Sequence, residues 1–326
     1  MTDRRAALAM LAGVAAGPAR VGAQSAGRAY RIGWLSSGAP RTEAYNAAFL
    51  ERLREQGFVE GRNFVVEFRS AEWRAERLPA LAAELERAGC DVLFAPGPEA
   101  TLRALKEASR ERAIVFAAND YDPVARGHVP SLAKPGGRIT GVTQFSTQLA
   151  GKRLEVLREL VPAARRVAVF TDPASENQLQ AAQEAAKALG LALQVHHFKT
   201  TPYDYEAGFA DFARHKAESL LMLSSGLFVV ARARIPQLAI QHRLPGVYNN
   251  YLWAESGGLV SYGANFNDTY RRAADKVALV LKGVRPADIP VEQPTAVEMV
   301  VNLRSAKALG VAIPETIRAR ADRVIE

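Results

Sequence analysis

Cysteine is almost absent from this chain of 326 residues, because Cys90 is the only one. A single thiol forms no disulfide within the chain and excludes a cysteine-cluster zinc or iron–sulfur site. Cys90 stands shortly before the apolar run at 92–95, where a cysteine is usually a small buried residue. We therefore interpret Cys90 as a packing residue and not as a nucleophile.

Long runs of like charge are also missing, although 42 Lys and Arg against 34 Asp and Glu give a net charge of +8. The two signs are interleaved along the chain, which gives little support to a nucleic-acid or membrane-surface role. With 48% hydrophobic residues, the composition is that of a globular protein. A chain of this length usually divides into two lobes, because a single core rarely grows so large.

The motifs of common catalytic chemistry are absent as well. No Gly-x-Gly-x-x-Gly follows a strand, and there is no Gly-x-Ser-x-Gly or His-Glu-x-x-His segment. Gly151-Lys152 resembles the end of a phosphate-binding loop, but Ser146 stands in place of its first glycine and Arg153 in place of its Ser or Thr. The five histidines are scattered, so the sequence predicts neither a metal site nor a cofactor site.

Residues 1–23 have the pattern of an export signal. An arginine pair at positions 4 and 5 precedes an apolar stretch over 6–16 and a small-residue site that ends at Ala23. The stretch is too short to span a bilayer, and the arginine pair fits either a general or a twin-arginine signal. We expect cleavage near Ala23 and a soluble periplasmic protein, with a buried N-terminal helix as the alternative.

The rest of the chain alternates short apolar strands with amphipathic helices, which is typical of βα units. Up to the middle of the chain, strands are predicted at 30–35, 63–69, 92–95, 113–118 and 139–143, with helices at 42–56, 74–88, from 99 onward and at 149–160. Beyond it, strands are predicted at 166–170, 191–198, 219–224, 245–250 and 259–263, with helices at 178–189, 205–215, 227–243 and 269–281. Pro236 is expected to kink the helix at 227–243.

This alternation stops over the Pro- and Gly-rich stretch 121–138 and then restarts. Two such series predict an α/β fold with two doubly wound parallel-sheet lobes of similar size. In these sheets, ligands bind outside the carboxyl ends of the strands. Helix N-termini at that edge offer N–H groups to an anionic group. The pattern does not separate an enzyme from a binding protein.

Asp120 and Asp122 follow the strand at 113–118 and are the best candidates for acid–base chemistry. The alternative is that Asp122 starts a turn while Asp120 caps the backbone or binds a ligand amine. Tyr248 and Tyr262 follow or end strands in the second series, and they either stack on a ligand or fill the core. Tyr251 and Trp253 are interpreted as structural.

Several segments are similar, in the same order, to segments of a known family. They are IVFAA at 114–118, DPV at 122–124, SLAKPGG at 131–137, ITG at 139–141, LAGKRLE at 149–155, GGLVSYG at 257–263, PVEQPT at 290–295, NLRSAKALG at 302–310 and ARADRVIE at 319–326. On these segments the chain resembles the proteobacterial ABC transporter substrate-binding proteins, which have the type I periplasmic-binding protein fold.

The resemblance implies two lobes joined by a hinge, with lobe 1 at 28–141 plus 266–290 and lobe 2 at 142–265 plus 291–326. A small polar or aromatic solute, such as an amino acid or another carboxylate, would bind in the cleft as the lobes close. The partner would be an ABC transporter permease in the membrane. The resemblance implies a monomer that is not an enzyme and has no catalytic residue, cofactor, metal or nucleic-acid partner.

The same resemblance places the ligand at the loops that follow strand ends. There, N–H and hydroxyl groups would bind a carboxylate, and Asp120 or Asp172 would bind an amine. Tyr248 or Tyr262 would stack on a ring of the ligand. The ligand-binding residues implied in this way are Ser36, Ser37, Gly97, Pro98, Asn119, Asp120, Thr143, Thr171, Asp172, Ser224, Ser225, Tyr248, Asn249 and Tyr262.

Two other functions stay open at this point. One is an α/β enzyme that uses Asp120 in the same cleft, although no nucleophile stands beside a base in any recognisable motif. The other is a ligand sensor that passes its signal to a membrane partner instead of delivering solute to a permease.

Overall fold

The structure is a computed structural model, and it describes residues 29–144 and 147–326. The export signal predicted at 1–23 lies outside the described residues. None of the helices in those two ranges has both the length and the apolar composition that a bilayer crossing needs.

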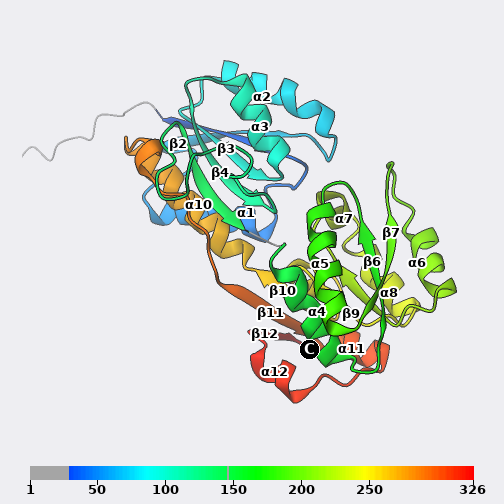
Figure 1. The fold of residues 1–326 in the computed structure, drawn as a ribbon. Helices are drawn as coiled ribbons and strands as arrows, with labels where there is room; N and C mark the ends of the chain where they lie inside the picture. Colours follow the sequence, from blue (N-terminus) through cyan, green and yellow to red (C-terminus); the bar gives the residue numbers. More distant parts are fainter. Residues whose placement is uncertain (1–28, 145–146) are drawn as a thin grey trace, which may run out of the picture.

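Two β-sheets organise the chain, each in its own lobe (Figure 1). The first sheet has five parallel strands in the order β2-β1-β3-β4-β5, so the chain starts inside the sheet and winds outward in both directions. Its strands are β1 (Tyr30–Ser36), β2 (Phe64–Ser70), β3 (Val92–Gly97), β4 (Ala113–Asn119) and β5 (Ile139–Gln144). This arrangement confirms the predicted doubly wound α/β architecture.

The second sheet has seven strands in the order β12-β11-β10-β9-β8-β6-β7. Its strands are β6 (Arg166–Thr171), β7 (Ala192–His197), β8 (Ser219–Met222), β9 (Gly246–Tyr248), β10 (Val260–Ala264), β11 (Val297–Asn302) and β12 (Arg323–Ile325). All neighbouring pairs are parallel except β10 and β11. The antiparallel pair arises because β11 enters this sheet from the side of the first lobe (Figure 1).

Helices cover both faces of each sheet. The first lobe carries α1 (Ala44–Glu55), α2 (Leu78–Arg87), α3 (Glu99–Ala108) and α10 (Phe266–Leu281), with 3-10 turns at Ala75–Arg77 and Pro286–Asp288. The second lobe carries α4 (Leu149–Leu160), α5 (Glu176–Leu189), α6 (Tyr205–Arg214), α7 (Gly226–Val230), α8 (Arg234–Gln241), α9 (Tyr251–Glu255), α11 (Leu303–Leu309) and α12 (Glu315–Arg320).

The central strands are apolar on both faces because each face supports a separate core. In β1, Ile32 and Trp34 belong to the core shared with α1 and α10, whereas Leu35 belongs to the core shared with α2 and α3. In β6, Val169 packs with α4 and α5, and Phe170 packs with α6 and α8. Successive side chains of a strand point to opposite faces, so burial on both faces requires continuous apolar runs.

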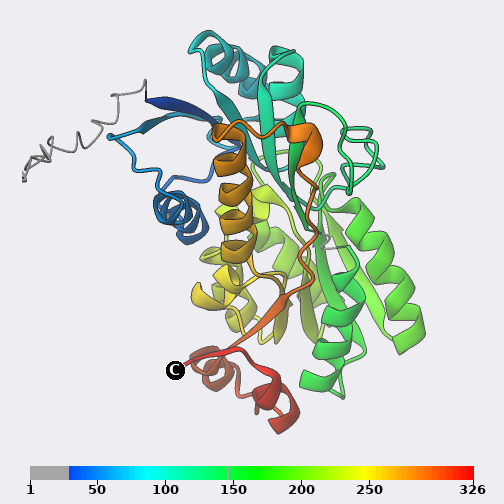
Figure 2. The same cartoon turned by 90° about the vertical axis from the view of Figure 1, so that its left-hand side faces the viewer.

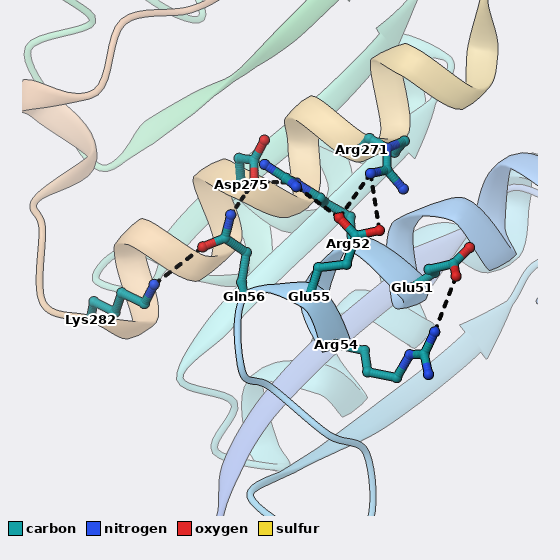
Figure 3. Close-up of polar contacts among 8 residues, drawn as sticks. All are labelled: Glu51, Arg52, Arg54, Glu55, Gln56, Arg271, Asp275 and Lys282. Carbon is teal, nitrogen blue, oxygen red and sulfur yellow. Dashed lines mark hydrogen bonds and ion pairs between the residues drawn. The ribbon is translucent and has the colours of Figure 1, made fainter.

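Helix α10 follows a strand of the second sheet but packs beside α1 on the first sheet (Figure 2). Polar contacts join the exposed edges of the two helices (Figure 3). Arg52 donates to Asp275 at 2.7 Å, and Arg271 donates to Glu55 at 2.8 Å. Exposed pairs of this kind each contribute at most about 1 kcal/mol, so the shared apolar core is the main reason that α10 docks here.

The segment after α10 crosses from the first lobe to β11 and is fixed at the crossing. The backbone N–H of Thr143 donates to Glu292 O at 2.8 Å, and that of Glu292 donates to Gly141 O at 3.1 Å. The ammonium of Lys276, whose residue is 2% exposed, donates to a carboxylate oxygen of Glu292 at 2.8 Å. The crossing segment therefore binds both β5 and α10 where the lobes meet.

Two local expectations are wrong. The helix predicted at 227–243 is two helices, α7 and α8, and the break at 231–233 precedes Pro236. Pro236 lies in the first turn of α8, where its missing N–H removes no helical hydrogen bond. The strand predicted at 245–250 is shorter, because Asn250 already caps the N-terminus of α9 through its side chain.

Substitution of Gly141 tests how closely β4 and β5 approach beside this crossing. A Cβ at Gly141 would lie 2.3 Å from Phe116 O, so we expect Gly141→Ala to lower the free energy of unfolding by about 1–3 kcal/mol. Gly137→Ala is the matched control, because a Cβ there has no atom within 4 Å. Chemical denaturation followed by circular dichroism measures both, and equal stability of the two variants would contradict the packing described here.

Candidate functional site

A cavity of about 370 Å³ lies between the two sheets, at the carboxyl ends of their strands. This is the place and the size expected for a small-molecule site in a doubly wound fold. Loops after β1, β3 and β4 form one wall, and loops after β6, β8 and β9 form the other. Both lobes therefore contribute to a single site.

The first lobe presents two well-defined turns to the cavity. The hydroxyl of Ser36 donates to Ala39 O at 2.8 Å and accepts from the N–H of Gly38 at 3.1 Å, which closes the turn after β1. Gly97 ends β3 with a φ of 94°, a conformation that glycine adopts without a steric penalty. Pro98 then caps α3, whose first N–H groups have no partner within the helix and lie at the cavity wall.

In the second lobe, hydrogen bonds with Gln178 and Asp172 fix the positions of Ser224 and Ser225. The amide side chain of Gln178 pairs with both backbone groups of Ser224, at 2.8 and 3.1 Å. The hydroxyl of Ser225 donates to the carboxylate of Asp172. Asp172, which is 3% exposed, also accepts from the hydroxyl of Tyr203 at 3.2 Å. Burial first, and then the Asp172 carboxylate, raise the pKa of Tyr203, so its hydroxyl stays neutral and donates.

Aromatic side chains form much of the cavity lining: Trp34, Tyr45, Trp73, Tyr121, Phe266 and Tyr270. The rings of Tyr45 and Tyr270 lie 4.7 Å apart. Burial is the largest cause that raises the pKa of both tyrosines, so their hydroxyls remain protonated. The Trp73 ring lies against two glycines. A Cβ built on Gly38 would lie 2.3 Å from the nearest atom of this ring, and a Cβ built on Gly226 would lie 3.0 Å from it. These glycines belong to different lobes, and Trp73 thus contacts both.

Charged groups of both signs also line the cavity: Glu99, Arg103, Asp120 and Arg126. Glu99 lies 2.9 Å from the imidazole of His128 and 3.6 Å from the guanidinium of Arg126. Asp120 interacts electrostatically with the fully buried Arg153 of α4. The site can therefore pair with an ammonium and with a carboxylate of the same small molecule.

Eight of the residues expected from the sequence line this cavity: Ser36, Ser37, Gly97, Pro98, Asn119, Asp120, Ser224 and Ser225. Asn249 lines a chamber of about 10 Å³ that adjoins the cavity through Asn119, Asp120, Ser224 and Phe266. Thr143, Thr171, Asp172, Tyr248 and Tyr262 line neither space.

Those five residues have other surroundings. Thr171 is buried beside Ser175, and Thr143 donates to Tyr121 O at 3.2 Å. Tyr248 is 1% exposed and stacks on Trp253 at 5.4 Å, on the face of the second sheet that points away from α4. Tyr262 packs against the opposite core. In this arrangement of the chain, neither tyrosine reaches the cavity to stack on a ligand ring.

The sequence did not identify Trp73, Phe266 or Tyr270 as cavity residues. Trp73 follows the end of β2, so the expectation that ligands bind at loops after strand ends could have identified it. Phe266 and Tyr270 lie on α10, which reaches the cavity only because it returns to the first lobe. No local sequence pattern predicts that α10 packs on the first lobe.

Within residues 29–144 and 147–326, no group of three or more His, Cys, Asp or Glu residues is placed to hold a metal ion. Cys90 is fully buried, and burial raises the pKa of its thiol to about 11. It packs in the core beneath α2 and α3, away from the cavity. Asp122 is exposed and accepts from the N–H groups of Val124 and Ala125, which makes it a turn residue.

Comparison with known proteins identifies relatives over most of the chain. Residues 38–325 match the family described as ABC transporter substrate binding protein. A protein of Clostridioides difficile called tyrosine-binding protein is 24% identical over 276 residues, which cover 83% of this chain and 77% of that protein.

Solved structures with the same fold include an ABC domain from Streptococcus pneumonia in complex with L-Trp. It has a TM-score of 0.80 and 22% identity, over 91% of this chain and all of that one. A ligand-free, open substrate-binding protein with adhesive properties from Clostridium difficile has a TM-score of 0.66 and 23% identity, over 91% of this chain and 99% of that one.

The contacts of Asp172 predict that its main contribution is to stability. Asp172→Ala would leave the N–H groups of Ala174 and Ser175 and the hydroxyls of Tyr203 and Ser225 without this acceptor. We expect it to lower the free energy of unfolding by about 2–4 kcal/mol.

Asp122→Ala is the matched control for Asp172→Ala, because it removes an exposed aspartate that caps a turn. We expect a loss of at most about 1 kcal/mol for this control. Denaturant titration of both variants measures the difference, and an unchanged stability of Asp172→Ala would refute the structural role.

Proposed function

The chain belongs to the ABC transporter substrate-binding protein family, and from this we propose that it is the periplasmic receptor of an importer for an aromatic amino acid or a similar aromatic carboxylate. The receptor acts as a monomer and delivers its solute to an ABC transporter permease in the membrane. Its export signal is residues 1–23. Lobe 1 comprises 28–141 plus 266–290, lobe 2 comprises 142–265 plus 291–326, and the two close on the solute by hinge motion.

The observation that carries this proposal is the combination of an aromatic lining with charged groups of both signs in one cavity between the lobes. Rings such as Tyr45, Trp73 and Phe266 favour a flat apolar side chain. Arg103 and the N-terminus of α3 favour a carboxylate, and Asp120 favours an ammonium. Relatives described as a tyrosine-binding protein and as an L-Trp complex support the same class of solute.

Two observations support a closed arrangement of the lobes. The first is that Trp73 contacts glycines of both lobes. The second is the ion pair between Glu43, which caps α1, and Arg232, which lies between α7 and α8, at 2.6 Å.

A thermal-shift screen of the purified protein tests the proposed solute class. L-Tryptophan, L-tyrosine and L-phenylalanine are compared with sugars, polyamines and nucleosides. A bound solute at about 100 times its Kd adds about 2.7 kcal/mol, which for lobes of this size corresponds to about 5–10 °C in Tm. We expect such a shift only with the aromatic compounds. We also expect the bound compound to be chemically unchanged when it is recovered from the protein. Shifts with other classes alone, or chemical conversion of the compound, would overturn the proposal.

The Glu43–Arg232 pair predicts a link between lobe closure and affinity. Arg232→Met removes an ion pair that joins the lobes, in which the Glu43 side chain is only 11% exposed. We expect a 2- to 10-fold weaker affinity for the solute identified in the screen, because a partly buried pair contributes about 0.5–1.4 kcal/mol.

Arg234→Met is the matched control, because the partner of Arg234 is Glu206 at 2.6 Å, in the same lobe. Isothermal titration calorimetry compares the two variants. Equal affinities of Arg232→Met and Arg234→Met would contradict the proposed closure contact.

A further inference from the structure

The small chamber beside the main cavity has an unusual polar lining. It has a volume of about 10 Å³, which is room for one group of the size of a water molecule. Asn119 contributes to it from the end of β4 in the first lobe, and Asn249 from the loop after β9 in the second lobe. Gln144 and Ala264, the last residues of β5 and β10, complete it where the chain crosses between the lobes.

Two residues that line this chamber each have a buried side-chain acceptor with no protein partner among residues 29–144 and 147–326. These acceptors are the side-chain Oδ1 atoms of Asn119 and Asn249. Buried carbonyl oxygens without a hydrogen bond are rare in folded proteins and cost about 1–3 kcal/mol each. Their pairing in one chamber, one from each lobe, indicates a site for a hydrogen-bond donor.

The chemistry of the lining narrows the identity of that donor. Asp120, a third residue of the chamber, adds a carboxylate that also interacts with Arg153. A carboxylate has several acceptor positions, so it can accept from an ammonium as well as from a guanidinium. A primary ammonium has three N–H donors and no acceptor, so it matches two amide oxygens and a carboxylate. The chamber adjoins the aromatic cavity through Asn119, Asp120, Ser224 and Phe266, so a group attached to a ligand there can reach it.

We propose that this chamber binds the α-ammonium group of the solute, with Asn119 and Asn249 as specificity-determining residues that distinguish amino acids from carboxylic acids without an amine. The inference rests on the proposed function and narrows its solute class to amine-bearing aromatic acids. An ammonium bound to both asparagines would also connect the two lobes, because Asn119 belongs to the first lobe and Asn249 to the second.

The decisive comparison uses matched pairs of compounds and the whole protein. Calorimetry measures the affinities for L-tryptophan and indole-3-propionate, and for L-tyrosine and 3-(4-hydroxyphenyl)propionate. In the wild-type protein we expect the amine-bearing member of a pair to bind about 10- to 100-fold more tightly, the value of one charge-assisted hydrogen bond.

Variants then locate the source of that preference. Asn249→Leu and Asn119→Leu should each reduce affinity for the amine-bearing compound by about 10-fold or more, while affinity for its partner changes less than threefold. Asn249→Asp, which keeps an acceptor whichever way the side chain is oriented, should retain the preference. Asn177→Leu is the control, because Asn177 lines the main cavity but not the chamber. Any change in affinity that it causes should be the same for both members of a pair, so their ratio should stay as in the wild-type protein.

The outcomes separate the inference from the function on which it rests. If the wild-type protein bound both members of each pair with equal affinity, the inference alone would be overturned, and a water molecule would be the occupant of the chamber. If the variants lost affinity equally for both members, Asn119 and Asn249 would be structural, which also overturns it. If the wild-type protein bound none of the four compounds, the proposed function and the inference would fail together.

Discussion

The buried guanidinium of Arg153 constrains how the two lobes meet. The side chain is fully buried on α4, directly after the chain has left the first sheet, and its Nε donates to Tyr262 O of β10 at 2.8 Å. Burial lowers its pKa to about 10, against the opposing effect of Asp120, so it remains charged at neutral pH. A buried cation is tolerated only with compensating groups around it. Asp120 comes from the first lobe, so this compensation joins the lobes.

Asp120 therefore has two roles that the sequence alone could not separate. It lines the cavity, as its place after a strand predicts, and it also balances the charge of Arg153. Its φ of 61° is uncommon for a residue with a side chain, and this left-handed turn ends β4. A carboxylate that lies near a fixed cation and lines the cavity can accept a hydrogen bond from an ammonium ligand.

The sequence predicted positions well and side-chain directions poorly. Apolar runs separated by Gly, Pro and Ser located the strands, because both faces of each sheet are buried. Ser36, Gly97 and Ser224 were found because strand ends meet at one edge. Tyr248 also ends a strand, but its side chain points into the core, and the face on which a residue lies depends on its register within the strand. Phe266 depends on the return of α10, which only tertiary packing decides.

The polar atoms around the cavity connect binding with the arrangement of the lobes. Trp34 Nε1, Tyr121 OH, Asn119 Oδ1 and Asn249 Oδ1 are buried without a partner among the residues that the structure describes. Trp34 and Tyr121 pack in cores of the first lobe, whereas Asn119 and Asn249 come from different lobes. Bringing these two asparagines together without a ligand costs free energy, because their buried acceptors then lack hydrogen bonds to water. A solute that supplies the missing partners lowers the free energy of the closed form relative to the open one, and only such a difference shifts the equilibrium between them. In the proposed receptor, Asn119 and Asn249 would therefore make closure depend on a solute that supplies donors to both.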